Sequence, residues 1–354
     1  MVRLEKLLKT CRLENIIVSA LRLLANSAEM YTYTIKTGGR DCPKNGQSHL
    51  CKNIIEGGFM TSTTLKRCAL IFMIVDHIGA FIPGAPIWMR WVGRLSFPIF
   101  MFIFVHSITL TRDYTKFKKR IFLMDLLMCV IDLIATHAIR YPNGQDQLLC
   151  NIFSTFFALL LLLETIDAIC KKKEKWQQKL SVYILWQIFS LAISILPLYI
   201  GMPDSLTYFL ARTSGNLFLN EGNLFWIMIG VIFYYSKHDL FIMSCLYLSV
   251  IAANTFILIE SIPLKAVNFL TWHLGYFGRK LGEICFGIIG GFQIYGNNPN
   301  RDLFHSNYQW MMVFALPLLL FYNGKRRNEH KYFYYLFYPI HIVILTLFSA
   351  FLYT

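Results

Sequence analysis

An acid and an imidazole lie side by side within an otherwise apolar stretch of this chain. The stretch is Leu65–Gly79, Leu-Lys-Arg-Cys-Ala-Leu-Ile-Phe-Met-Ile-Val-Asp-His-Ile-Gly, and it contains Asp76 and His77. A helix rises about 1.5 Å per residue, so His77 lies roughly 17 Å beyond Lys66, near the middle of a hydrocarbon layer about 30 Å thick. Ionisable groups are costly at that depth, which favours a functional site facing a cavity. A hydrogen-bonded but inert packing pair is the alternative.

A second histidine is predicted at a similar depth near the end of the chain. His341 closes the run Lys331-Tyr-Phe-Tyr-Tyr-Leu-Phe-Tyr-Pro-Ile-His, and a helix places it about 15 Å beyond Lys331. Pro339 lacks a backbone N–H, which frees carbonyl groups nearby. Histidine titrates near neutrality and serves well as a general base. We therefore predict that His77 and His341 meet and are catalytic, together with Asp76.

The partner of Asp76 is a separate question, because neighbouring side chains on a helix point about 100° apart. Asp76 is therefore not assumed to orient the ring of His77, and Arg94 is an alternative partner for its carboxylate. Arg94 and Tyr338 are also the residues that we expect to stabilise a negatively charged oxygen during the reaction.

The composition indicates an all-α, polytopic transmembrane bundle. Of the 354 residues, 56% are hydrophobic and 15% are charged, and the mean hydropathy is +0.48. A soluble domain of this composition would expose large apolar patches, whereas repeated apolar runs between short polar loops are typical of membrane spans. The nine cysteines show no pairing or metal-binding pattern, so neither disulfides nor a metal is expected.

The net charge of +14 does not indicate nucleic-acid binding, because the basic residues gather in short loops. These loops are Lys116–Arg120, Lys171–Lys175 and Lys325–Lys331, and such loops are typically cytoplasmic. The expected partner is membrane lipid, and no oligomeric state is predicted. We predict about nine spans, with a range of about eight to eleven, and broken or re-entrant segments at 206–220 and 264–298. The predicted spans are Leu65–Ile82, Arg94–Leu110, Ile121–Ala138, Leu148–Ile169, Leu180–Ile200, Leu224–Tyr235, Phe241–Ile262, Gln309–Tyr322 and Tyr332–Leu352.

Residues 1–59 differ from the rest, being polar with one short apolar stretch. One hypothesis is a poorly structured leader. Another is that these residues are not translated, because Glu56-Gly57-Gly58-Phe59-Met60 is encodable as a purine-rich ribosome-binding sequence followed by a start codon. In either case residues 60–354 are predicted to form a single transmembrane domain.

Several short motifs, in their order and separation, resemble the TraX-type conjugation proteins, which are bacterial membrane acetyltransferases acting on pilin. The resemblance covers most of Thr63–Leu352 and implies transfer of an acetyl group from acetyl-CoA to a pilin N-terminal amine at the bacterial inner membrane. A glycan or a small amine is the alternative acceptor. Asn151 begins one motif and is predicted to bind substrate. The motifs are Leu65-Lys66 followed by Asp76-His77-Ile78-Gly79, Gly93-Arg94-Leu95-Ser96-Phe97-Pro98-Ile99-Phe100, Asn151-Ile152-Phe153-Ser154-Thr155, and Tyr322-Asn323-Gly324-Lys325-Arg326 followed by Lys331-Tyr332-Phe333 through Phe337-Tyr338-Pro339-Ile340-His341.

Acetyl-CoA is the expected co-substrate, and its phosphates need cations at the cytoplasmic face. We predict that Lys325, Arg326 and Arg327 bind them, together with Lys66 and Arg67. The alternative is that this basic cluster only determines topology. A transporter or flippase, or a scaffold of a conjugation or secretion apparatus, remains the alternative function, because buried polar residues also line substrate paths.

Overall fold

The computed structural model describes residues 60–138, 151–172, 174–201, 204–237, 239–290, 302–325 and 331–353. The chain divides into two units, Met1–Gly57 and Gly58–Thr354, and every described residue belongs to the second. The predicted leader at 1–59 therefore lies outside the described residues, and so does the question of a start at Met60.

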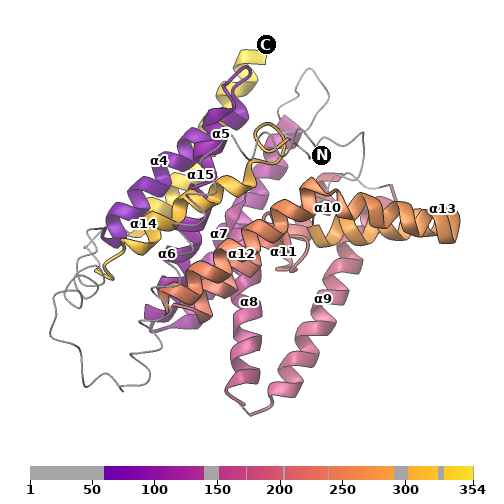
Figure 1. The fold of residues 1–354 in the computed structure, drawn as a ribbon, viewed down its shortest axis with the longest axis horizontal. Coiled ribbons are helices and arrows are strands. Elements are labelled where there is room, and N and C mark those ends of the chain that lie inside the picture. The colour runs from indigo at the N-terminus through magenta and orange to yellow at the C-terminus, as the bar shows by residue number, and fades with distance from the viewer. Residues whose placement is uncertain are drawn as a thin grey trace, which may run out of the picture. The chain divides into compact units, whose positions relative to one another are not determined.

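The predicted all-α class is confirmed, because the described residues form helices joined by turns, apart from one isolated bridge between Met60 and Tyr322 (Figure 1). The helices are α4 (Ser62–Phe81), α5 (Trp88–Gly93), α6 (Ser96–Leu110), α7 (Tyr114–Ala138), α8 (Ile152–Cys170), α9 (Trp176–Tyr199), α10 (Asp204–Thr213), α11 (Asn223–Tyr235), α12 (Leu240–Ile259), α13 (Ile262–Gly290), the 3₁₀ helix η2 (Tyr308–Ala315), α14 (Leu316–Leu320) and α15 (Lys331–Tyr353).

Within the described ranges, four helical stretches are long and apolar enough to cross a membrane. They are Trp88–Leu110, Ile152–Cys170, Leu240–Ile259 and Phe333–Leu352. Multiple spans are therefore supported by length and composition, while the expected total of about nine stays a prediction.

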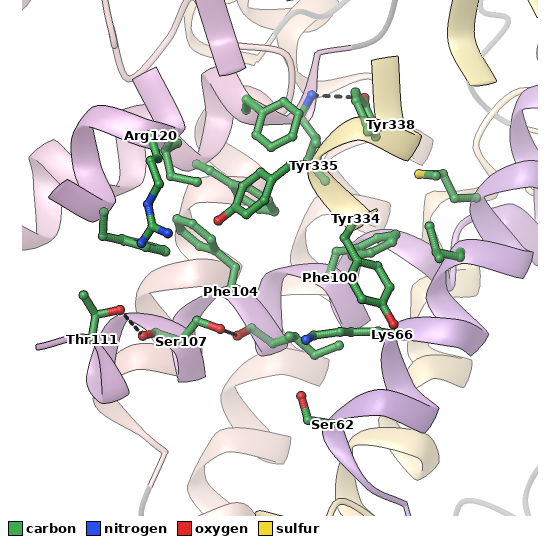
Figure 2. A pocket seen from close by; sticks show the side chains of 18 residues that line it. Ser62, Lys66, Phe100, Phe104, Ser107, Thr111, Arg120, Tyr334, Tyr335 and Tyr338 are labelled. Carbon is green, nitrogen blue, oxygen red and sulfur yellow. Dashed lines mark hydrogen bonds between the residues drawn. The ribbon is translucent and has the colours of Figure 1, made fainter. Parts of the chain in front are cut away.

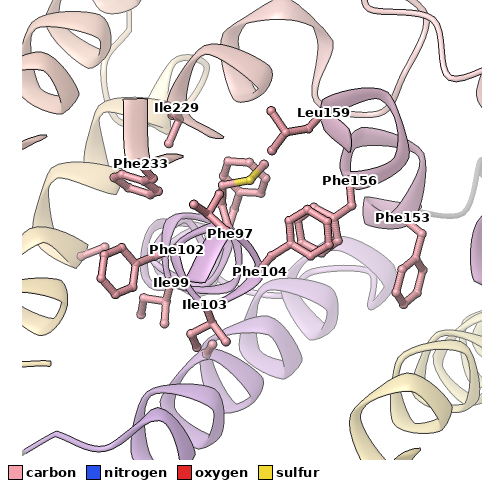
Figure 3. Close-up of a cluster of buried hydrophobic side chains, with 14 of the residues drawn as sticks. Phe97, Ile99, Phe102, Ile103, Phe104, Phe153, Phe156, Leu159, Ile229 and Phe233 are labelled. Atoms are coloured by element: carbon pink, nitrogen blue, oxygen red, sulfur yellow. The ribbon is translucent and has the colours of Figure 1, made fainter. Parts of the chain in front are cut away.

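Helix α6 lies at the centre of the apolar core, and Figure 3 shows it in end view with α8 and α11 around it. Its sequence is apolar on every face, which is the pattern of a helix surrounded by other helices. Phe104 stacks on Phe156 of α8 with ring centroids 4.0 Å apart, and Phe102 meets Phe233 of α11 edge-on at 5.6 Å. Pro98 is the third residue of α6, where its missing N–H removes no helical hydrogen bond.

The two segments that we expected to be broken are both interrupted. Helix α10 ends at Thr213, and residues 214–222 are non-helical, with the side chains of Asn216 and Asn220 buried. Helix α13 contains Gly275 at φ 58° and ψ −141°, a conformation that only glycine adopts readily. Re-entry into a membrane stays a prediction for both segments, and residues 291–298 of the second lie outside the described part of the chain.

The beginning of α4 is tied to the segment before α15, although more than 250 residues separate them in sequence. Met60 N–H donates to Phe321 C=O at 3.1 Å, and Asn323 N–H donates back to Met60 C=O at 3.0 Å. Ser62 N–H donates to Lys325 C=O at 3.1 Å. These bonds satisfy donors at the start of α4 and place α4 and α15, which pack together, in a common frame.

Candidate active site

His77 of α4 and His341 of α15 form a direct hydrogen bond, with 2.7 Å between Nδ1 of His77 and Nε2 of His341. The two rings are nearly parallel, with centroids 5.0 Å apart. Both side chains are buried, with 5% and 8% of their surface exposed. The prediction that two imidazoles from opposite ends of the chain converge is therefore confirmed. Their catalytic role stays a prediction.

The hydrogen bonds determine which nitrogen carries hydrogen in the neutral pair. Nδ1 of His341 lies 2.9 Å from the carbonyl oxygen of Phe337, and a carbonyl only accepts, so Nδ1 of His341 is the donor. Nε2 of His341 then accepts from Nδ1 of His77. The remaining nitrogen, Nε2 of His77, bears a lone pair, and no hydrogen bond to it is formed by the described residues. That atom is the one able to take a proton from a substrate.

The carboxylate of Asp76 forms an ion pair with Arg94, the alternative partner that the sequence offered. Nη2 of Arg94 lies 2.6 Å from each carboxylate oxygen. A second arginine, Arg90 of α5, lies 3.0 Å from Oδ1 and also donates to the Asp76 carbonyl at 2.9 Å. Sequence reasoning missed Arg90, although its spacing of four residues from Arg94 places both on one helical face.

Close packing and an aromatic ring hold this ion cluster in place. A Cβ on Gly93 would lie 2.2 Å from both Cβ and Oδ1 of Asp76, so only glycine allows the two helices to approach this closely. The Arg94 guanidinium lies 5.5 Å from the ring centre of Tyr308, and Arg90 Nε donates to the Tyr308 hydroxyl at 3.4 Å.

Before η2, backbone N–H groups of Phe304 and His305 donate to the Asp302 carboxylate and hold its pKa below its usual value. They also fix the turn that leads into η2.

A cavity of about 460 Å³ lies between α4, α6, α7, α8 and α15, and its lining approaches the histidine pair without including His77 or His341. Its lining includes Met73 and Tyr338, each about one helical turn before a histidine. The Tyr338 ring contacts both imidazoles edge-on, at 6.4 Å from His77 and 5.5 Å from His341. Its hydroxyl accepts the Ile152 N–H at 3.2 Å, drawn as a dashed line in Figure 2. Tyr338 thus touches both the cavity and the histidine pair.

The basic residues that we predicted to bind phosphate lie in different parts of the structure. Lys66 lines the cavity, whereas Arg67 is exposed and is not part of its lining. Lys325 is exposed, and its carbonyl is bonded to the start of α4. Arg326 and Arg327 lie outside the described residues.

Asn151 is buried at the start of α8 and joins that helix to α7. Its Nδ2 donates to Oδ1 of Asp125 at 2.7 Å and to Sγ of Cys129 at 3.3 Å, and it is not part of the cavity lining. Asp132, seven residues after Asp125 on α7, has a different partner. Asp132 pairs with Arg212 at 2.9 Å. Contact of Asn151 with substrate stays a prediction.

The family model described as TraX protein matches residues 61–349. The chain belongs to the TraX family. The matched range runs from the residue before α4 to near the end of α15, so it contains both histidines, the ion cluster and the cavity lining. No curated protein and no solved structure matches the chain.

In this TraX-family protein the histidine pair comes from the two ends of the matched range, whereas the cavity is lined by α4, α6, α7, α8 and α15. No group of three or more His, Cys, Asp and Glu side chains is arranged to hold a metal within the described ranges. The chemistry that the described site offers directly is proton transfer by an imidazole pair near a cavity with a mostly apolar lining.

Proposed function

We propose that this protein is an integral membrane acetyltransferase, which moves an acetyl group from acetyl-CoA to an amine or hydroxyl of an exported acceptor. The observation that supports this most directly is the 2.7 Å hydrogen bond between His77 and His341. An isolated buried histidine is a common packing residue, but a pair in which one ring fixes the tautomer of the other resembles a general base with its orienting partner.

The reaction needs a group that accepts one proton, and it replaces the C–S bond of the thioester with a C–N or C–O bond. Nε2 of His77 takes the proton from the acceptor amine or hydroxyl as its nitrogen or oxygen attacks the thioester carbonyl. The C–S bond then breaks, and the sulfur of coenzyme A leaves with the electron pair and receives the proton. Nε2 of His341 accepts a hydrogen bond from Nδ1–H of His77, and this hydrogen bond stabilises the imidazolium that forms.

Tyr338 is better placed than Arg94 to stabilise the charged oxygen of this reaction. It lines the cavity and contacts both imidazoles, whereas the guanidinium of Arg94 is held by both oxygens of Asp76. We assign to Asp76 and Arg94 the role of positioning α4 against α5, so Asp76 acts on His77 through the backbone of α4 rather than by direct contact.

The acceptor follows from the family and from the location of the protein. Membership in the TraX family suggests a pilin N-terminal amine, and an acceptor of this kind reaches the site from the outer side of the bacterial inner membrane. The acetyl donor is cytoplasmic, so donor and acceptor approach from opposite ends of the bundle. A glycan or a small amine would fit the same chemistry.

The test uses membranes containing the protein and acetyl-CoA labelled in its acetyl group, and it measures which molecule acquires the label. We expect His77→Ala and His341→Ala each to reduce transfer by at least about 100-fold, because general-base catalysis contributes about that much. His273→Ala, which alters an exposed histidine on α13, should retain full activity. All variants must be present in the membrane at the wild-type level.

Two results would contradict the proposal. Full transfer by His341→Ala would remove the imidazole pair from the mechanism. Failure of the wild-type protein to transfer acetyl groups, together with movement of a solute into liposomes, would favour a transporter.

A further inference from the structure

The cavity beside the histidine pair contains a cation that the sequence did not indicate as a binding residue. Arg120 lies on the second turn of α7 and contributes to the lining. We infer that Arg120, acting with Lys66, binds a phosphate group of the acyl donor inside this cavity. This inference rests on the proposed function and deepens it, because it assigns the donor to a particular cavity and one phosphate to a particular side chain.

The charge of the lining supports an anionic ligand. The residues that line the cavity include two cations, Arg120 and Lys66, and no aspartate or glutamate. Figure 2 shows the two side chains entering from opposite walls, Lys66 from α4 and Arg120 from α7. Both cations would attract an anion that enters the cavity.

The hydrogen bonding of Arg120 points in the same direction. Its Nε is buried and has no hydrogen-bond partner among the described residues, and no described carboxylate pairs with its guanidinium. A buried donor without a partner costs free energy. The guanidinium instead lies 5.8 Å from the ring centre of Phe117, which leaves its fork of N–H groups for a planar or tetrahedral anion.

The rest of the lining fits the thioester arm that is attached to such a phosphate in the acyl donor. Hydroxyl groups of Ser107, Thr111 and Tyr335 lie at the same cavity as Arg120, and Phe104, Leu70 and Met73 supply apolar walls. A volume of about 460 Å³ is within the usual range for small-molecule sites. A flexible thioester arm of amides, a hydroxyl and methylene groups, with a phosphate at one end, matches this mixture of polar and apolar lining. Tyr338 at the lining would bring the thioester near the histidine pair.

The experiment measures binding by the full-length protein in nanodiscs, without any acceptor present. The three probes are coenzyme A, 4′-phosphopantetheine and pantetheine, of which only pantetheine lacks phosphate. We expect Arg120→Gln to bind coenzyme A and 4′-phosphopantetheine more than tenfold more weakly, with pantetheine binding unchanged. Arg120→Lys should recover part of the loss. The matched control is Lys119→Gln, which removes the same charge from the exposed neighbour and should bind all three probes as the wild type does.

A second variant tests the cavity independently of Arg120. Ser107→Trp fills the space from α6 and should weaken binding of all three probes, pantetheine included. Unchanged binding by this variant would overturn the location of the donor.

The remaining outcomes separate this inference from the proposed function and from a lipid site. Equal binding of coenzyme A by the wild type and Arg120→Gln would overturn the inference and leave the acetyltransferase proposal intact. Absence of coenzyme A binding by the wild type would overturn both.

A phospholipid phosphate is the other source of the same chemistry. If anionic lipid in the nanodisc weakens coenzyme A binding to the wild type but not to Arg120→Gln, the two phosphates compete at Arg120. If Arg120→Gln changes only lipid binding, the site belongs to the lipid and the inference is wrong.

Discussion

At the scale of single residues, the costliest feature of the described site is the buried charge of Asp76. Taking a carboxylate out of water costs several kcal/mol unless ion pairs and hydrogen bonds compensate. Here Arg94 binds both oxygens and Arg90 adds a third contact. The sequence indicated the acid and one of its partners. It did not indicate Arg90 or the closeness of Gly93, because both depend on the angle at which α5 crosses α4.

Loss of the Asp76 charge should destabilise the fold, because the buried Arg94 would then lack its counter-ion. We expect Asp76→Asn to lower the free energy of unfolding by about 3–5 kcal/mol, measured as a fall in the melting temperature in detergent. Combining it with Arg94→Leu should cost less than the sum of the single changes, because the double variant leaves fewer unpaired charges. Asp113→Asn, which removes an exposed pair with Lys116, is the control and should leave the melting temperature unchanged. An unchanged melting temperature for Asp76→Asn would show that the cluster is not structural.

At the scale of elements, α6 organises the core because it is apolar on all sides and other helices cover it. Its contact with α11 continues to α12, where Phe233 meets Tyr247 at 5.4 Å. The sequence predicted α6 and α12 as spans from their length and apolar composition. It did not predict which faces meet, because a helix that is apolar all round has no polar face from which to infer its orientation.

The contact between Phe233 and Tyr247 should contribute to the free energy of unfolding mainly through packing and less through removal of apolar surface from water. Lipid tails are as apolar as a helix interior, so a truncated side chain loses mainly van der Waals contacts. We expect Phe233→Ala to lower the free energy of unfolding by about 1–3 kcal/mol, less than the 3–5 kcal/mol typical of a water-soluble core. Phe256→Ala removes the same ring from an exposed position on α12 and should have little effect. Equal losses in the two variants would contradict the assignment of α11 and α12 faces.

At the scale of the whole described unit, the residues of the three basic loops that the structure describes lie toward one end of the bundle. Ser62 is bonded to Lys325, and Ser62 lines the same cavity as Arg120. Lys118 Nζ lies 2.5 Å from Glu164 Oε2 near the end of α8, and the Lys171–Lys175 loop follows that helix. The sequence assigned all three loops to the cytoplasm from charge alone, and their placement at a common end supports that expectation.

This arrangement predicts the sidedness of two loops that flank one candidate span. A short epitope inserted after Gly84 should be accessible to antibody in spheroplasts, and one inserted after Arg112 only in inside-out vesicles. Both insertions fall at exposed positions and should retain acetyl transfer, which serves as the control. Accessibility of both epitopes from the same side would show that Trp88–Leu110 does not cross the membrane. Exchange of the two sides would contradict the cytoplasmic assignment of the basic loops.

The sequence by itself determined the all-α class, the family, and the three residues whose burial needs explanation, Asp76, His77 and His341. It did so because apolar runs and ionisable groups within them are local properties of the chain. Only the tertiary structure decided that the histidines share a hydrogen bond, that Asp76 is held by two arginines, and that Arg120 rather than Arg67 reaches the cavity. Those facts depend on how α4, α5, α7 and α15 are rotated and brought together, and rotation among helices with extensive apolar faces is determined by packing between distant parts of the chain.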